Sequence, residues 1–123
     1  GTDVTIIATG IMVAEAKKAV ELLKKDGINA ELISANVIKP LDEKTILESI
    51  KKTKHVVTCE NHNLIGGLYS AVAELVCQKY PLNIHGIGIQ DRFGQVGKYN
   101  DLLKEYQMTP QDIYNIVKNN LNE

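Results

Sequence analysis

The segment DVTIIATGIMVAEAKKAVELLKKDG (3–27) decides the fold, because it sets a short apolar strand directly before an amphipathic helix. Its first six residues are mostly β-branched, which favours a strand buried on both faces. In the rest of the segment apolar residues recur at helical spacing, and Gly27 predicts where the helix ends. Ile28 is then placed to fold back on Leu23 in a Schellman ending.

The alternation of strand and helix continues along the chain, without repeats or linkers. After residue 27, strands are expected at 30–36, 54–60 and 83–89. Helices are expected after Pro40 and Asp42, at about 66–80, and, as a short helix, at 101–107. A last helix should begin with Thr109 as N-cap, Pro110 at its first position and Asp112 two residues on. This alternation predicts one α/β domain over residues 1–123. Its architecture is three-layer α/β/α, with a doubly wound parallel sheet of four strands in the order 2-1-3-4.

Composition excludes several classes of protein. The 123 residues are 44% hydrophobic and 24% charged, which is typical of a soluble globular domain. The net charge of −1 gives no electrostatic reason to expect nucleic acid or an acidic membrane as a partner. No apolar run approaches the ~20 residues that cross a bilayer. Cys59 and Cys77 are too few for a disulfide scaffold and favour a reducing, cytoplasmic location.

The predicted strand order places a switch point between the first and third strands. In open parallel sheets, ligands tend to bind at such a crevice, beyond the carboxyl ends of the strands. The loops expected there are TGIM (9–12) and ENHNLIGG (60–67). The candidate site residues in these loops are Gly10, Glu60, His62, Gly66 and Gly67.

Neither metal binding nor nucleophilic catalysis is favoured in this region. His55 and Cys59 stand at opposite ends of one predicted strand, and four residues at about 3.3 Å each keep them too far apart to share an ion. Attack by Cys59 with His62 as base lacks a third group that would orient the imidazole. We therefore expect no catalytic residue and no metal ligand.

Phosphate binding has a better basis, because the helices after the first and third strands direct their positive ends at the crevice. Gly10, Gly66 and Gly67 allow close approach of a ligand to the backbone. Neither a GxGxxG fingerprint nor a P-loop is present. The favoured alternative is that the glycine pair and the small residues after it let the helix pack closely against the sheet or a neighbour.

The loop DRFGQVG, after the fourth predicted strand, holds the single arginine and the single phenylalanine of the chain. Asp91 and Arg92 can form a surface ion pair of small energetic value, and Phe93 can be an ordinary core residue. Gly94 and Gly97 provide pivots. A rim with one aromatic residue, one arginine and several glycines also suits a protein interface.

Four motifs together resemble the C-terminal domain of transketolase. DVTIIATG, IKPLD, ENHNLIGGLYSAVAE and IGIQDRFGQVGKYNDLL occur in the order and spacing of that family, over essentially all 123 residues. The family comprises thiamine-diphosphate-dependent transferases that move two-carbon ketol units between sugar phosphates, a reaction of the pentose phosphate pathway. The chain most resembles the split type, whose C-terminal subunit carries a pyrimidine-binding domain followed by this one.

The resemblance also implies what this domain does not do. In the family, thiamine diphosphate and magnesium are held by other domains, so no cofactor is expected on this chain and the isolated domain is expected to be inactive. Its implied role is to pack on the pyrimidine-binding domain and help build a dimer that also contains the pyrophosphate-binding domain. The family fold has an antiparallel edge strand before DVTII; we expect it to be missing here, which leaves one sheet edge bare.

Two loops carry the family's motifs. The residues that match its EEHxxxGG loop are Glu60, His62, Gly66 and Gly67. The residues that match its DxFGxSG loop are Asp91, Phe93, Gly94 and Gly97. The chain departs from these patterns at Asn61, Gln95 and Val96, and Tyr69 stands where glycine is common. We assign these loops, with Gly10 and Arg92, to an interface or to anion binding.

Relatives of the family are alternatives. In 1-deoxyxylulose-5-phosphate synthase the loop after the fourth strand typically begins DRF but then continues differently, with a histidine. The beta subunits of 2-oxo acid dehydrogenases share the fold and match these motifs less well. A free-standing flavodoxin-like domain that binds a small anion is the alternative from another class. The favoured hypothesis is the C-terminal interface domain of a cytoplasmic transketolase.

Overall fold

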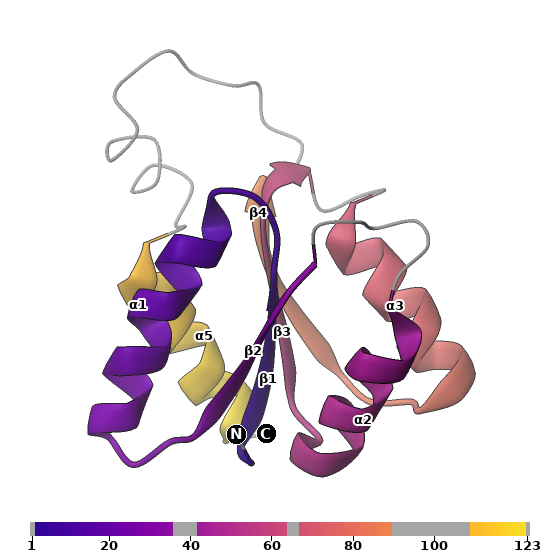
Figure 1. The fold of residues 1–123 in the computed structure, drawn as a ribbon, viewed down its shortest axis with the longest axis horizontal. Coiled ribbons are helices and arrows are strands. Elements are labelled where there is room, and N and C mark those ends of the chain that lie inside the picture. Colours follow the sequence, from indigo (N-terminus) through magenta and orange to yellow (C-terminus); the bar gives the residue numbers. More distant parts are fainter. Residues whose placement is uncertain (1, 36–41, 64–66, 90–108, 123) are drawn as a thin grey trace.

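The described part of the chain contains four strands and four helices. The computed structural model describes residues 2–35, 42–63, 67–89 and 109–122 (Figure 1). Its elements are β1 (Val4–Ala8), α1 (Met12–Lys25), β2 (Ala30–Ser34), α2 (Glu43–Thr53), β3 (Val56–Asn63), α3 (Leu68–Lys79), β4 (Ile84–Ile89) and α5 (Pro110–Leu121). All eight elements were predicted. The short helix predicted at 101–107 lies outside the described residues.

The four strands form one parallel sheet in the predicted order, β2-β1-β3-β4. Thr5 of β1 pairs with Glu31 of β2 on one side and with Val56 of β3 on the other, and Val56 pairs with Ile84 of β4. Because the strands are parallel, their carboxyl ends lie together at one end of the sheet. We call this the carboxyl end, and the opposite end the amino end.

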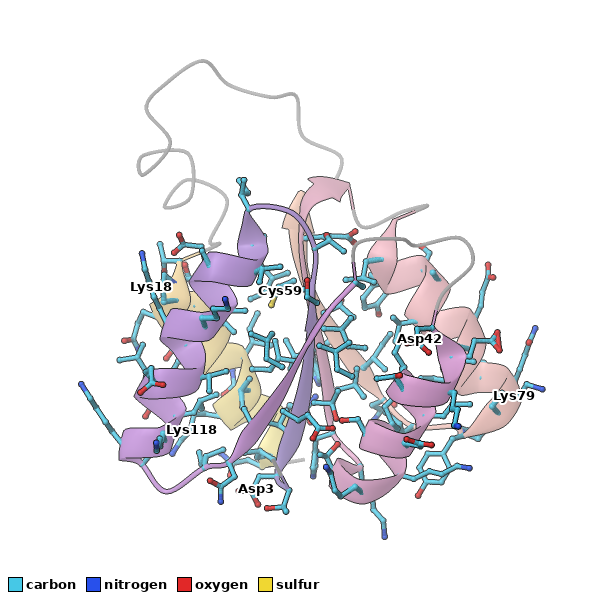
Figure 2. The ribbon with its side chains drawn as sticks, viewed as in Figure 1. Asp3, Lys18, Asp42, Cys59, Lys79 and Lys118 are labelled. Atoms are coloured by element: carbon cyan, nitrogen blue, oxygen red, sulfur yellow. The ribbon has the colours of Figure 1, made fainter. Side chains whose placement is uncertain are left out.

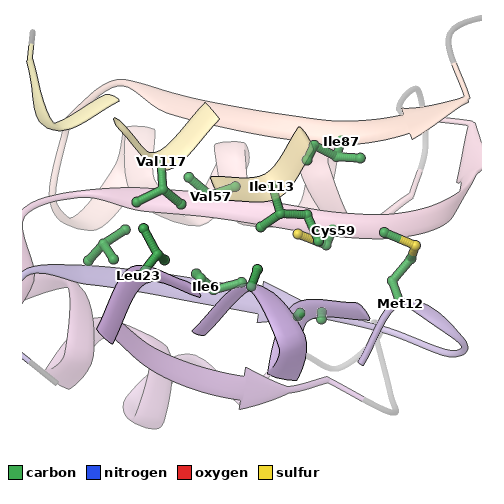
Figure 3. Packing of buried hydrophobic residues seen from close by; sticks show 12 residues of the cluster. Ile6, Met12, Leu23, Val57, Cys59, Ile87, Ile113 and Val117 are labelled. Atoms are coloured by element: carbon green, nitrogen blue, oxygen red, sulfur yellow. The ribbon is translucent and has the colours of Figure 1, made fainter. Parts of the chain in front are cut away.

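Helices cover both faces of the sheet, with α1 and α5 on one face and α2 and α3 on the other (Figure 1). Side chains alternate along β1, so Ile6 packs in the core beneath α1 and α5, while Ile7 packs in the core beneath α2 and α3. Every residue of β1 is buried, as its β-branched composition predicts. The labelled residues of the first core in Figure 3 are Ile6, Met12, Leu23, Val57, Cys59, Ile87, Ile113 and Val117.

Local signals in the sequence begin and end these helices. Gly27 has a φ of 75°, and the Ile28 N–H donates to the Leu23 carbonyl at 3.0 Å, which confirms the predicted Schellman ending of α1. Asp42 caps α2 by accepting a hydrogen bond from the Thr45 N–H. Within the described ranges, no helix is long and apolar enough to span a membrane.

At the amino end, polar side chains join α2 to the sheet. The Thr5 hydroxyl lies 2.7 Å from the hydroxyls of both Ser49 and Thr53, and all three residues are buried. On the more exposed side of the same helix, Lys52 forms a 2.8 Å ion pair with Glu31 of β2. These contacts fix the last turn of α2 against the starts of two strands.

The helix α5 is fixed at both of its ends. Thr109 and Asp112 form a capping box at its start, as the sequence signals predict. Near its end, the buried Asn120 donates to the Val56 carbonyl at 3.2 Å, and its side-chain oxygen lies 2.6 Å from Nδ1 of His55. This second contact attaches the C-terminal helix to the amino end of β3.

Candidate functional site

The structure brings several predicted site residues to the carboxyl end of the sheet. Gly10 follows β1, Glu60 lies in β3, and Gly67 precedes α3. Since β1 and β3 are neighbours, this region is the predicted switch point. The backbone of His62 belongs to β3. The remaining predicted residues lie outside the described part of the chain: Gly66, Asp91, Arg92, Phe93, Gly94 and Gly97.

Glu60 is the central residue of this region and is fully buried. Its Oε2 accepts a hydrogen bond from the Leu68 N–H at 2.6 Å, and its Oε1 accepts one from the Tyr69 N–H at 3.2 Å. These are the first two residues of α3, whose amide groups have no carbonyl partner within the helix. The carboxylate also lies at the positive end of the helix dipole. Glu60 therefore caps α3 from the neighbouring strand.

This cap bears on the anion-binding alternative. Two of the amide groups that a phosphate would use at the start of α3 already donate to a buried carboxylate. A second anion next to Glu60 would also meet repulsion between like charges in a region of low dielectric. Anion binding at Gly66 and Gly67 stays a prediction, and this geometry weighs against it.

Cys59 is not placed to act as a nucleophile. It is fully buried between the sheet and α1 (Figure 2), and this burial, together with the charge of Glu60, raises the pKa of its thiol to about 12. The reactive thiolate is therefore scarcely populated at neutral pH. Because side chains alternate along β3, Cys59 and Glu60 also face opposite sides of the sheet.

The His, Cys and Glu residues of β3 do not assemble into a metal site in the part of the chain that the structure describes. There, no group of three or more His, Cys, Asp or Glu side chains could hold a metal ion. His55 lies at the amino end, where its ring contacts Asn120. Cys59 and Glu60 are the fourth and fifth of the eight residues of β3, because the strand continues to Asn63, beyond its predicted end at residue 60.

The turn from β1 into α1 is tied to the sheet by its backbone. The Thr9 N–H donates to the Cys59 carbonyl at 3.0 Å, and the Met12 N–H donates to the Thr9 carbonyl at 3.1 Å. Gly10 has a φ of 56°, in the left-handed region that favours glycine. Next to it, Ile11 has 46% of its surface exposed, and it is the large hydrophobic residue left exposed among those described.

Sequence reasoning missed a contact between α3 and β4. A Cβ atom at Gly86 would lie 2.4 Å from Cδ2 of the Tyr69 ring and 3.1 Å from Oγ1 of Thr58. The ring therefore packs against bare backbone, and glycine is required at this position for space. The available signal was Tyr69 at a position where the family commonly has glycine, but sequence spacing does not connect it to Gly86.

Comparison with known proteins agrees with the resemblance. Residues 1–113 match the family described as "Transketolase, C-terminal domain". A putative transketolase C-terminal section of Methanocaldococcus jannaschii is 49% identical over 116 residues, and a 6-deoxy-6-sulfo-D-fructose transketolase subunit of Clostridium sp. is 46% identical over 113 residues. A 1-deoxy-D-xylulose-5-phosphate synthase of Heliobacterium modesticaldum is 36% identical over 119 residues. These matches cover 92%, 92% and 96% of this chain but only 35%, 35% and 18% of the relatives.

Solved structures show the same fold. A split-gene transketolase, solved as an inactive beta4 tetramer, is 40% identical with a TM-score of 0.94; the match covers 99% of this chain and 40% of that one. A transketolase mutant from Pichia stipitis is 21% identical with a TM-score of 0.66, over 98% of this chain and 16% of that one, and supports the fold alone. Family match, relatives and fold all agree: this chain belongs to the family of transketolase C-terminal domains.

Proposed function

We propose that this chain is the C-terminal interface domain of a split-type transketolase, which moves two-carbon ketol units between sugar phosphates with thiamine diphosphate and magnesium. In this proposal the pyrimidine-binding and pyrophosphate-binding domains perform the reaction, and this chain orders them within a homo-oligomer. The observation that carries the proposal is the burial of Glu60. The best acid–base candidate of the region caps α3 and is closed to a substrate.

The described residues do not fit thiamine diphosphate or its metal ion. Among the residues that the structure describes, no group of three or more His, Cys, Asp or Glu side chains could hold the metal ion. The first two amide groups of α3, which could otherwise bind a diphosphate, donate to Glu60. The turn before α1 presents the apolar side chain of Ile11, which has nothing to offer a diphosphate. The proposal therefore gives this chain no step in ketol transfer. Its contribution is to hold the catalytic domains in place.

We propose that the interface lies at the carboxyl end of the sheet and includes the predicted loops. Residues 61–73 contain no Asp, Glu, Lys or Arg, and charge is depleted at the centre of protein interfaces. The proposed interface residues are Gly10, Glu60, His62, Gly66, Gly67, Asp91, Arg92, Phe93, Gly94 and Gly97. Among these, the role of Glu60 is to fix the start of α3 beneath the contact.

We also propose a cytoplasmic location and a place in the pentose phosphate pathway. Cys59 and Cys77 are both free thiols, and Cys77 is exposed, which agrees with a reducing compartment. The pathway follows from the sugar phosphates that the proposed reaction uses.

The test of this proposal compares the 123-residue chain with the full gene product that contains it, supplied with its partner subunit. Both receive thiamine diphosphate, magnesium, xylulose 5-phosphate and ribose 5-phosphate. We expect ketol transfer by the full product and none above a blank by the chain alone. Turnover by the chain alone would overturn the interface role, and an inactive full product would overturn the transketolase assignment.

The second candidate is 1-deoxyxylulose-5-phosphate synthase, because the Heliobacterium relative is 36% identical over 119 residues. The sequence GQVGKYNDLL after DRF favours transketolase instead. Assaying the full gene product for 1-deoxyxylulose 5-phosphate separates the two. Formation of this compound without ketol transfer between sugar phosphates would select the synthase.

A small-anion binder is tested separately by calorimetric titration of phosphate into the chain. The interface role predicts no saturable binding, because Glu60 already occupies the start of α3. Tight binding that is lost on replacing the glycine pair, Gly66 and Gly67, would favour the anion binder.

A further inference from the structure

We infer that the turn from β1 into α1 anchors this chain on a neighbouring domain of the same enzyme, with Ile11 inserted into an apolar pocket of that domain. The inference rests on the proposed function and deepens it, because it names the contact residue and the chemistry of the surface that receives it.

Ile11 is exposed together with Gly10, while Thr9 before them and Met12 after them are buried. Its exposed fraction is 46%, whereas Thr9 is 6% exposed and Met12 is fully buried. A single exposed isoleucine is ordinary on a protein surface, so its exposure alone carries little weight. Two further observations bear on Ile11: hydrogen bonds fix the backbone just before it, and the chain around it is uncharged.

The backbone just before Ile11 is hydrogen-bonded on both sides. The Ala35 N–H donates to the Ala8 carbonyl at 2.9 Å, and the Thr9 N–H donates to the Cys59 carbonyl at 3.0 Å. Ala8, at the end of β1, is thus bonded to the residue that follows β2, and Thr9, directly after β1, is bonded to β3. A side chain presented on such a turn loses little conformational freedom on binding, which is the property of an effective anchor.

The surroundings of Ile11 along the chain carry no charge. Residues 9–14 contain no charged residue, and neither do residues 61–73 after β3. The first charged residue of α1, Glu15, is buried, and its Oε1 lies 3.8 Å from Nζ of Lys18. Apolar anchors seated in desolvated pockets dominate the energy of protein interfaces, and charge is depleted around them. The receiving surface is therefore an apolar pocket with an uncharged rim.

The size of the contact favours a domain of the same polypeptide over a second copy of this chain. The matched segment makes up 35% of two relatives, which leaves 65% of their length for further domains. A linked domain is present at high effective concentration, so a small contact with one anchor can hold it. A stable dimer of separate copies buries roughly 1,200 Å² or more and needs a larger apolar area than one isoleucine.

The experiment places Ile11→Lys in the 123-residue chain and in the full gene product. In the chain alone, lysine at this exposed position should leave the melting temperature unchanged. In the full product, it puts a charge into the apolar pocket, so we expect limited proteolysis between the domains to accelerate at least about tenfold. Asn29→Lys is the matched control, because it adds the same charge at an exposed position at the amino end.

Four outcomes overturn the inference. The first is unchanged proteolysis of the Ile11→Lys full product. The second is a drop in the melting temperature of the chain alone, which would mean that the chain itself covers Ile11. The third is self-association of the chain alone that Ile11→Lys abolishes, which would assign the pocket to a second copy. The fourth is a gene product no longer than this chain. Ketol transfer by the unaltered full product, measured alongside, tests the proposed function separately.

Discussion

The two ends of the sheet are completed in different ways. At the amino end, the chain satisfies its own polar groups: the Thr5 hydroxyl contacts α2, and Asn120 joins α5 to β3. At the carboxyl end, the Thr9 hydroxyl is buried without a hydrogen-bond partner among the described residues, and Ile11 is exposed. These polar groups of the amino end are thus paired within the chain, whereas at the carboxyl end the side chain of Ile11 is left exposed.

Lysines gather at the amino end, although the start of α2 at the carboxyl end also carries the exposed charges of Asp42, Glu43 and Lys44. The last turns of α1 and α2 carry Lys24, Lys25, Lys51 and Lys52, and both turns lie at the amino end. Lysines there complement the negative ends of the helix dipoles and keep this end solvated. The chain around the turn before α1 and after β3 lacks charge. Lysines thus keep one end of the sheet solvated, while the other end holds the uncharged segments that we propose as the interface.

The largest expected effect comes from Glu60→Ala at the carboxyl end. It removes the acceptor of the buried Leu68 amide and of the partly buried Tyr69 amide at the start of α3, so we expect a loss of about 3 kcal/mol in the free energy of unfolding. Chemical denaturation measures this loss. Glu60→Gln keeps one acceptor oxygen and the side-chain shape, and should lose clearly less. Equal losses in the two variants would show that the cap is not the source.

The next effect is that of Gly86→Ala, which would bring a Cβ atom within 2.4 Å of the Tyr69 ring. Overpacking of this kind should lower the free energy of unfolding by about 2 kcal/mol. Adding Tyr69→Ala should recover part of the loss, because the clash then disappears. Gly27→Ala is the control: nothing lies within 4 Å there, and only its positive φ opposes the change, at about 1 kcal/mol. An additive double mutant would refute the contact.

A smaller effect is expected at the amino end from Asn120→Ala. The Val56 carbonyl and the His55 ring would each lose a partner, which should cost about 1.5 kcal/mol in the free energy of unfolding. Thermal or chemical denaturation measures it. Asn119→Ala is the matched control, because this neighbour is exposed on the same helix turn. Similar losses from both substitutions would argue that helix propensity, and not the contact with β3, is responsible.

The smallest effect is electrostatic and also belongs to the amino end. The hydrogen bond from Lys52 lowers the pKa of Glu31 from 4.5 to about 2. The pair therefore stabilises the fold above about pH 4.5, and this contribution is lost as the pH falls towards 2. The two side chains are 31% and 45% exposed, so screening by solvent limits the effect to less than about 1 kcal/mol. Glu31→Gln should remove this part of the acid dependence, and an unchanged pH profile would contradict the pairing.

The fold was predictable because its signals are local. A strand buried on both faces, the Schellman ending at Gly27 and the capping box at Thr109 each depend on residues close in sequence. The strand order followed from crossover rules that apply to any chain of this pattern. The candidate site was predictable only in position. Its residues were expected where parallel strands end, but the sequence did not show which of them would be buried.

By itself, the sequence determined the alternating elements, the family, and the loops that meet at the switch point, because each of these depends on periodicity or on motifs. Only the tertiary structure decided that Glu60 caps α3, that Tyr69 requires Gly86, and that Ile11 is left exposed. The physical reason is distance along the chain. These roles depend on atoms that distant segments bring together, and on burial, which is set when helices cover the sheet.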